Sequence, residues 1–228
     1  MKQLALGVRL RADAVFESFW PGCNGEIVAT LRNPGAPPLW LWGAGGTGKT
    51  HLLQAVCAEA GAAAAYFPLT RALGLPPEAL AGFARNRVLC VDDVDAVAGD
   101  LAWETSLFRL FNEAAELRTR LIFAAAAPPR QPDWCLEDWR SRAAACVVYQ
   151  LRELDDDGRI EALRLRAAQR GLQLPQEISE YLLKRMPRDL RSLLGILDQL
   201  DEASLVAQRR LTIPFIRDAL EKRAGTKS

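Results

Sequence analysis

The residues with the clearest chemical meaning lie in a glycine-rich stretch, residues 43–50, which reads Gly-Ala-Gly-Gly-Thr-Gly-Lys-Thr. The spacing is that of a phosphate-binding loop (P-loop), whose glycines let backbone N–H groups turn toward phosphate oxygens. Its lysine brings a positive charge to the β- and γ-phosphates, and the hydroxyl beside the lysine ligates Mg²⁺. The stretch therefore predicts a site for ATP or ADP with Mg²⁺. The predicted contacts are Gly43, Gly45, Gly46, Thr47, Gly48, Lys49 and Thr50, with Thr50 also a metal ligand.

Two acids supply the second motif that a P-loop requires. Residues 88–93 read Val-Leu-Cys-Val-Asp-Asp, an apolar run that ends in Asp92 and Asp93. By itself such a run would be an ordinary strand end. Downstream of a P-loop, it predicts that Asp92 binds the nucleotide's Mg²⁺ and that Asp93 orients the attacking water.

The elements that must position these motifs alternate along the chain. Short apolar runs predict strands, and the stretches between them, such as residues 51–60 and Leu101–Leu117, have helical spacing. Such alternation predicts a parallel sheet covered by helices on both faces. The expected strands are Leu39–Trp42 and residues 63–67, 87–91, 120–124 and 146–149.

After about residue 151 the pattern becomes purely helical. Helices are expected to open near residues 158, 176, 189 and 212, and we expect the third of them to end at Leu200. The expected organisation is an N-terminal tail (residues 1–12), an αβα nucleotide-binding domain (residues 13–150) and a small all-α lid domain (residues 151–228).

Composition excludes several classes of protein. The chain has 228 residues, 50% hydrophobic and 25% charged, with a formal charge of +1. A near-neutral chain has no global attraction to nucleic acid or anionic lipid, so we expect no sequence-specific DNA binding. No run approaches the roughly 20 apolar residues of a membrane helix, and no signal peptide is visible. Five scattered cysteines without a close pair argue against disulfides and zinc, and we expect a cytoplasmic protein.

The sequence resembles the DnaA family of AAA+ proteins, and within it the regulators of the Hda type more closely than DnaA itself. The resemblance covers most of the chain, from about residue 16 to residue 215. It implies an AAA+ fold, with adenine nucleotide between the P-loop domain and the lid, and a working form that holds ADP. It depends on the P-loop followed by His-Leu-Leu, on Asp92-Asp93, on Pro128-Pro129-Arg130, on Ser141-Arg142 and on residues 188–191, Arg-Asp-Leu-Arg.

The resemblance also implies roles for three further groups. Arg142 matches the arginine finger that AAA+ chains present to a neighbour's nucleotide; the alternative is a solvated arginine beside Arg140. Arg191 matches the sensor 2 arginine of the lid; the alternative is a surface arginine on a basic face with Arg185 and Arg188. The peptide Gln3, Leu4 and Leu6 matches the segment that binds the β sliding clamp of DNA polymerase III; the alternative is a tail docked on its own domain.

Two departures from the family pattern predict weak or no intrinsic ATPase activity. Asp93 is shorter than the glutamate found in many such ATPases. Relatives carry polar or acidic residues after the fourth strand, at the position called sensor 1, whereas residues 125–127 are all alanine here.

The expected function is therefore regulatory. The chain would bind ADP or ATP, dock on the clamp and stimulate hydrolysis of ATP on DnaA, preventing re-initiation of DNA replication. It would act by supplying Arg142 in trans. Self-association is a further expectation, since AAA+ surfaces pair. The alternatives are a helicase-loader-type ATPase and an ATP-regulated binder of single-stranded DNA.

Overall fold

Five short apolar runs form one parallel sheet in the computed structural model, which describes residues 10–187, 189–207 and 211–224. The strand order is β2-β3-β4-β1-β5, and every neighbouring pair is parallel. The bounds lie within one residue of the predicted ranges. The strands are β1 Leu39–Trp42, β2 Ala64–Pro68, β3 Val88–Asp92, β4 Arg120–Ala125 and β5 Val147–Gln150.

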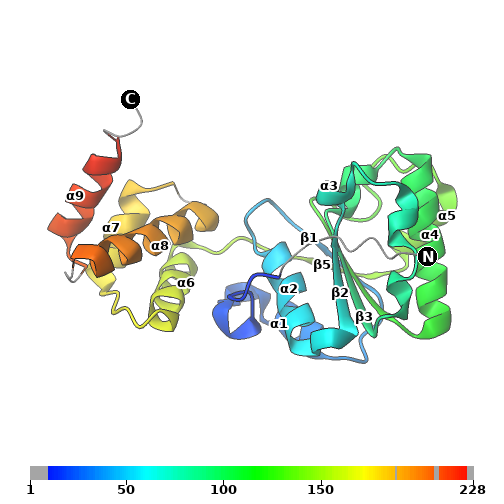
Figure 1. Ribbon diagram of the computed structural model, residues 1–228, viewed down its shortest axis with the longest axis horizontal. Coiled ribbons are helices and arrows are strands. Elements are labelled where there is room, and N and C mark those ends of the chain that lie inside the picture. Colours follow the sequence, from blue (N-terminus) through cyan, green and yellow to red (C-terminus); the bar gives the residue numbers. More distant parts are fainter. Residues whose placement is uncertain (1–9, 188, 208–210, 225–228) are drawn as a thin grey trace. The chain divides into compact units, whose positions relative to one another are not determined.

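Helices connect the strands and cover both faces of the sheet (Figure 1). Parallel strands need such crossovers, because the chain must return to the same edge before each new strand. The helices are α1 Gly25–Arg32, α2 Lys49–Ala60, α3 Leu69–Ala72, α4 Leu101–Leu117 and α5 Glu137–Ala144. Short 3₁₀ turns are η1 Phe16–Ser18, η2 Gly22–Asn24, η3 Gly61–Ala63, η4 Pro77–Leu80, η5 Phe83–Arg85 and η6 Val94–Val97.

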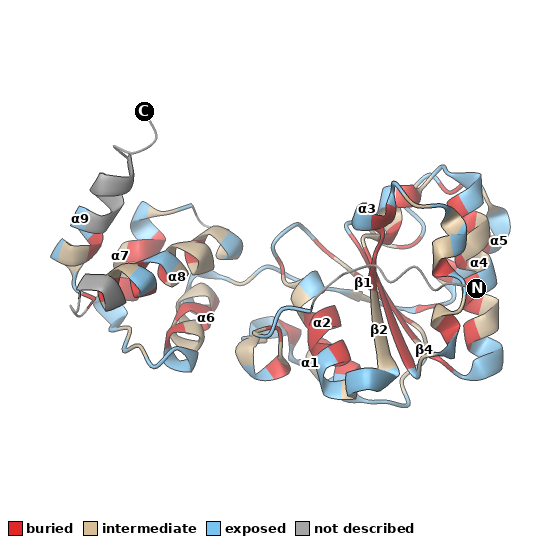
Figure 2. Cartoon of the chain, viewed as in Figure 1, coloured by how far each residue is buried: buried red, intermediate tan, exposed pale blue. Residues whose placement is uncertain are grey.

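Alternate residues of β1 belong to two different cores. Leu39 and Leu41 pack with apolar residues of α1 and α2, whereas Trp40 packs with those of α4 and α5. Side chains of a strand point to opposite faces in turn, so β1 is buried on both sides (Figure 2). It follows that α2, which begins at the P-loop, and α5, which carries Arg142, lie on opposite faces of the sheet.

A buried glutamate holds the segment that leads into α5. Glu104 of α4 has no exposed surface, and its carboxylate accepts hydrogen bonds from the backbone N–H groups of Gly99, Cys135 and Leu136. Charged acceptors of this kind are stable when buried only because donors replace their water. Glu104 therefore fixes the start of α5 against α4.

A buried asparagine fixes the end of the first of the two compact units into which the chain divides, Met1–Glu153 and Leu154–Ser228. Asn24 donates from Nδ2 to the carbonyl oxygen of Arg152 (3.0 Å), and its Oδ1 accepts from the Arg152 amide (2.9 Å). One side chain thus satisfies both the N–H and the carbonyl oxygen of Arg152.

The second unit consists of helices, as the sequence predicts from residue 151 on. The helices are α6 Asp156–Gln169, α7 Gln176–Arg185, α8 Leu190–Ala207 and α9 Ile213–Ala224. Asp155 caps α6, Asp189 accepts the Ser192 amide at the start of α8, and Gly171 follows α6 at φ +72°. Leu163 and Ala167 of α6 pack against Leu183, Leu193 and Leu197.

One expectation for this unit is wrong. Helix α8 runs to Ala207 rather than to Leu200; residues 201–207 contain no proline or glycine to end it, and Asp201 and Ser204 are buried on its inner side. Arg185 ends α7 and Arg191 lies in the first turn of α8, so the basic face expected for Arg185, Arg188 and Arg191 would span two helices and stays a prediction. Among the described residues, no helix combines the length and apolar character needed to cross a bilayer.

An ion-pair network between α6 and α8 centres on Asp198, and we expect its removal to lower stability measurably. Asp198 accepts from Arg166 Nε (3.1 Å) and Nη2 (2.9 Å) and pairs with Arg170 (3.1 Å), and the Arg166 side chain is only 13% exposed. Asp198→Ala should therefore lower the free energy of unfolding by about 1–3 kcal/mol, measured by urea denaturation. The control Glu202→Ala, an exposed position on the same helix, should cost less than about 0.5 kcal/mol. Equal effects of the two changes would contradict the role of the network.

Candidate functional site

The P-loop runs from the end of β1 into α2, and its shape requires glycine at two positions. Gly48, just before α2, has a φ of +101°, and a Cβ there would lie 2.7 Å from Phe19 Cε2. A Cβ on Gly43 would lie 2.4 Å from the carbonyl oxygen of Leu151. The two glycines therefore let the N-terminal segment and the chain after β5 close against the loop.

Lys49 is the cation of this loop. Its ammonium donates to the carbonyl oxygens of Gly43 (2.5 Å) and Ala44 (2.9 Å). Burial lowers the pKa of Lys49, and nearby carboxylates, Asp92 foremost, oppose that shift. The ammonium thus lies between the loop and the acids that follow β3, where a lysine can reach phosphate oxygens.

Asp92, at the end of β3, is the most buried acid of the site, with 1% exposure. Its Oδ2 accepts hydrogen bonds from the hydroxyls of Thr50 and Tyr66, both at 2.7 Å, and its Oδ1 accepts from the Asp93 amide at 3.1 Å. Burial raises the pKa of Asp92, while the Thr50 and Tyr66 hydrogen bonds lower it. The same burial, with the negative charge of Asp92 beside it, raises the pKa of Tyr66, so its hydroxyl keeps its proton and remains a donor.

The Thr50–Asp92 pair fits Mg²⁺ bound together with a nucleotide. Hydroxyl and carboxylate oxygens are the ligands that this ion prefers, and it keeps several waters and substrate phosphates in its shell rather than a full protein cage. Within the described ranges, no group of three or more His, Cys, Asp or Glu side chains could hold a metal. The protein's share of the coordination would therefore come from Thr50 directly and from Asp92 directly or through water.

Asp93 adopts a left-handed backbone conformation, with φ +55°. Its Oδ2 accepts a hydrogen bond from the hydroxyl of Thr70, at 2.8 Å, in the helix that follows β2. The expected role of Asp93 in orienting the attacking water stays a prediction. A water bound at Oδ2 would compete with the Thr70 hydroxyl for that oxygen.

Three polar residues of the site, Tyr66, Thr70 and Asp95, were missed by the sequence reasoning. Asp95, in the turn after β3, accepts a hydrogen bond from the Ala126 amide (2.9 Å), so a carboxylate lies beside the alanine run at the end of β4. A usable signal did exist. In parallel sheets the carboxyl ends of neighbouring strands meet at one edge, where ligands bind, so polar residues ending β2 deserved the same weight as those ending β3.

Arg142 lies on α5 and is exposed. Its guanidinium carbon is 5.9 Å from the ring centroids of both Phe108 and Phe111 of α4, a distance at which a cation is attracted to an aromatic face. Among the described residues, no carboxylate lies within ion-pair distance of Arg142.

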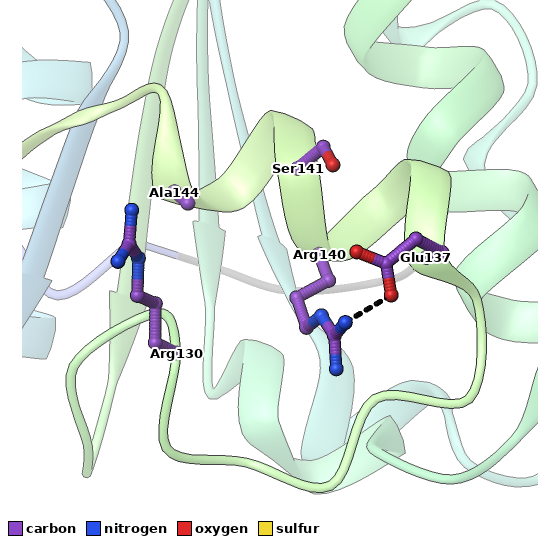
Figure 3. A pocket seen from close by; sticks show the side chains of 5 residues that line it. All are labelled: Arg130, Glu137, Arg140, Ser141 and Ala144. Atoms are coloured by element: carbon purple, nitrogen blue, oxygen red, sulfur yellow. Dashed lines mark hydrogen bonds and ion pairs between the residues drawn. The ribbon is translucent and has the colours of Figure 1, made fainter.

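A hollow of about 360 Å³ lies beside α5. Figure 3 shows the five residues that line it, among them Arg130 from the loop after β4, and Arg140 turned toward Glu137. Arg140 and Glu137 form an ion pair one helical turn apart, so the charge of Arg140 is neutralised within its own helix. The neighbouring arginines Arg140 and Arg142 thus differ in electrostatic partner although both are exposed.

The roles expected for the remaining predicted residues stay predictions. Arg191 is exposed in the second unit, so its relation to the P-loop stays a prediction. Gln3, Leu4 and Leu6 lie outside the described residues.

The second unit matches a known family. Residues 156–220 match the family model described as "Hda, lid domain".

Solved structures resemble most of the chain. Domain III of the replication initiation protein DnaA from Thermotoga maritima gives a TM-score of 0.77 at 22% identity, covering 94% of this chain and 98% of that one. AMPPCP-bound DnaA from Aquifex aeolicus gives 0.68 at 25% identity, covering 84% and 66%. RuvB, the Holliday junction branch migration motor of Thermotoga maritima, gives 0.61 at 16% identity, covering 86% and 64%. The predicted fold, an AAA+ P-loop domain with a helical lid domain, is confirmed.

The buried carboxylate predicts a pH-dependent stability difference. Because its pKa is raised in the folded protein, Asp92 penalises folding increasingly as pH rises from its ordinary carboxyl value of 3.8 through the folded value. An asparagine cannot ionise and escapes this penalty. The free energy of unfolding of Asp92→Asn minus that of the unaltered protein should therefore be more positive at about pH 7 than at about pH 3.5. Urea denaturation at both pH values measures this difference.

The control is Asp133→Asn, an exposed aspartate for which the described residues supply no partner. Its stability relative to the unaltered protein should change little over the same range. A shift for Asp133→Asn as large as that for Asp92→Asn would show that burial of Asp92 is not its cause.

Proposed function

We propose that the chain belongs to the Hda/DnaA family of AAA+ proteins and that it regulates the replication initiator DnaA by promoting hydrolysis of DnaA-bound ATP; the match of residues 156–220 to the Hda lid-domain model and the likeness of the fold to DnaA support this. In this function the chain binds an adenine nucleotide with Mg²⁺, and ADP is its working ligand. The glycine-shaped loop, the Lys49 ammonium and the Thr50–Asp92 pair support such a site. Hydrolysis of its own nucleotide is slow, because Thr70 engages the carboxylate of Asp93 and residues 125–127 carry no polar side chain.

The placement of Arg142 is the observation that supports action on another molecule's nucleotide. Arg142 packs on α4 on one face of the sheet, and the chain's own P-loop leads into α2 on the opposite face. It is exposed, and no carboxylate among the described residues neutralises it. A cation so placed can meet a phosphate that a neighbouring molecule carries.

The chemistry at DnaA follows that of other arginine fingers. Water attacks the γ-phosphorus of the bound ATP while the bond to the β–γ bridging oxygen breaks, and negative charge gathers on the transferred group and the departing ADP. The guanidinium of Arg142 stabilises that charge, and such a finger supplies about 10³–10⁵ in rate.

The N-terminal residues Gln3, Leu4 and Leu6 tether the protein to the β sliding clamp. A tether raises the effective concentration of a weak contact to about millimolar when its length suits the span. The tail is fixed soon after this peptide, since the Arg11 amide donates to Gln54 Oε1 of α2 (3.1 Å). A short tail anchored on the nucleotide domain suits such tethering.

Replacing the finger tests the central claim. Arg142→Ala should lower the stimulation of ATP hydrolysis on DnaA by at least about 100-fold, because the charge on the transition state loses its partner. The assay follows labelled ATP pre-bound to DnaA, with clamp-loaded DNA and the ADP form of this protein. The matched control is Arg140→Ala, which removes an arginine two residues away that pairs with Glu137 and should retain most of the stimulation.

Equal loss in both variants would indicate general damage to α5 rather than loss of a finger. No stimulation by the unaltered protein, with clamp binding intact, would exclude the proposed function and favour a helicase-loader-type ATPase.

Replacing the tail residues tests the tether separately. Alanine at Gln3, Leu4 and Leu6 together should abolish clamp binding, measured by surface plasmon resonance, and should weaken stimulation at low concentration of the protein. A large excess should restore the stimulation, because the tether only raises local concentration. Lys2→Ala is the control in the same tail. Loss of stimulation that no excess restores would mean that the tail does more than tether.

A further inference from the structure

We infer that the hydroxyl of Tyr66 is a positioning group for the Mg²⁺-binding carboxylate of Asp92, and that it sets how strongly Mg²⁺ contributes to nucleotide affinity. The inference rests on the proposed binding of an adenine nucleotide with Mg²⁺. It concerns a residue outside both sequence motifs, on a strand that the motifs do not include.

Sheet order places Tyr66 beside the acid. Strand β2 pairs with β3 in parallel register, with Tyr66 opposite Cys90 and Pro68 opposite Asp92. The half-buried ring of Tyr66 lies along this edge, and its hydroxyl donates to Asp92 Oδ2 at 2.7 Å. This is the same oxygen that accepts from Thr50, also at 2.7 Å.

These contacts determine the orientation of the carboxylate. Two hydroxyls on Oδ2 and the Asp93 amide on Oδ1 hold it at three points. Thr50 is itself an expected metal ligand, so the position of its hydroxyl must suit both the metal and the hydrogen bond to Asp92. Tyr66 is not an expected metal ligand, so its hydrogen bond serves only to orient Asp92.

Such a partner matters because Mg²⁺ tolerates little misplacement. The ion demands near-ideal octahedral geometry, and removing a hydrogen-bond partner of a metal ligand typically costs about 10–100-fold in metal affinity. The competing explanation is that Tyr66 serves only to pack its ring. Tyr66→Phe distinguishes the two, because it removes the hydroxyl and keeps the ring.

The experiment measures the affinity of a fluorescent ADP as a function of Mg²⁺ concentration, with no hydrolysis involved. For Tyr66→Phe, the Mg²⁺ concentration that gives half of the metal's effect should rise about 10–100-fold. The affinity measured in EDTA should stay within about twofold, because the P-loop contacts to phosphate are unchanged. The matched control is Tyr149→Phe, whose hydroxyl contacts Thr30 and Glu26 on another part of the unit and should leave both quantities unchanged.

A second measurement keeps Tyr66 in place, so it tests the inference even if Tyr66→Phe does not fold. The chain has three tyrosines, so in the double variant Tyr149→Phe, Tyr181→Phe, Tyr66 is the one that remains. Incorporated 3-fluorotyrosine then reports on Tyr66 alone. Adding Mg²⁺ to the ADP form should shift its ¹⁹F resonance, and an unmoved resonance would overturn the inference.

The outcomes separate this inference from the proposed function. If the unaltered protein binds ADP more tightly with Mg²⁺ and Tyr66→Phe has the same Mg²⁺ dependence, the inference alone is wrong. If the unaltered protein shows no Mg²⁺-dependent ADP binding, the inference and the nucleotide part of the proposed function both fail.

Discussion

The buried carboxylate of Asp92 is the constraint on which the rest of the first unit depends. A carboxylate taken from water costs several kcal/mol unless donors replace its hydration. Those donors come from α2 through Thr50, from β2 through Tyr66 and from the turn after β3. Three segments far apart in the chain must therefore converge on one point, and the strand order β2-β3-β4-β1-β5 makes this convergence possible.

One sheet supports both the P-loop and Arg142. The residues of β1 alternate between two cores. One core packs under α2, which follows the P-loop, and the other packs under α4 and α5, the helix that carries Arg142. Because both cores share the strands, the P-loop and the exposed Arg142 are held on the same sheet. Glu104 also fixes the start of α5 with three hydrogen bonds from backbone amides.

What the sequence could predict is what depends on local pattern. The P-loop, the acids ending β3 and the bounds of β1 and α4 follow from spacing within a few residues. Tyr66, Thr70 and Asp95 were missed because their importance arises from neighbours on other strands, which periodicity does not reveal. The end of α8 was placed at Leu200 instead of Ala207, since the pattern of single residues does not show where a helix without a stop signal ends.

The hydrogen bonds of Asn24 to Arg152 have a consequence for the border between the two units. Arg152 is fixed to the first unit by two hydrogen bonds, and Asp155 is fixed to the second by capping α6. The border between the two units, after Glu153, therefore lies one residue from an anchored backbone position on either side, so the two anchors fix where each unit ends in the chain.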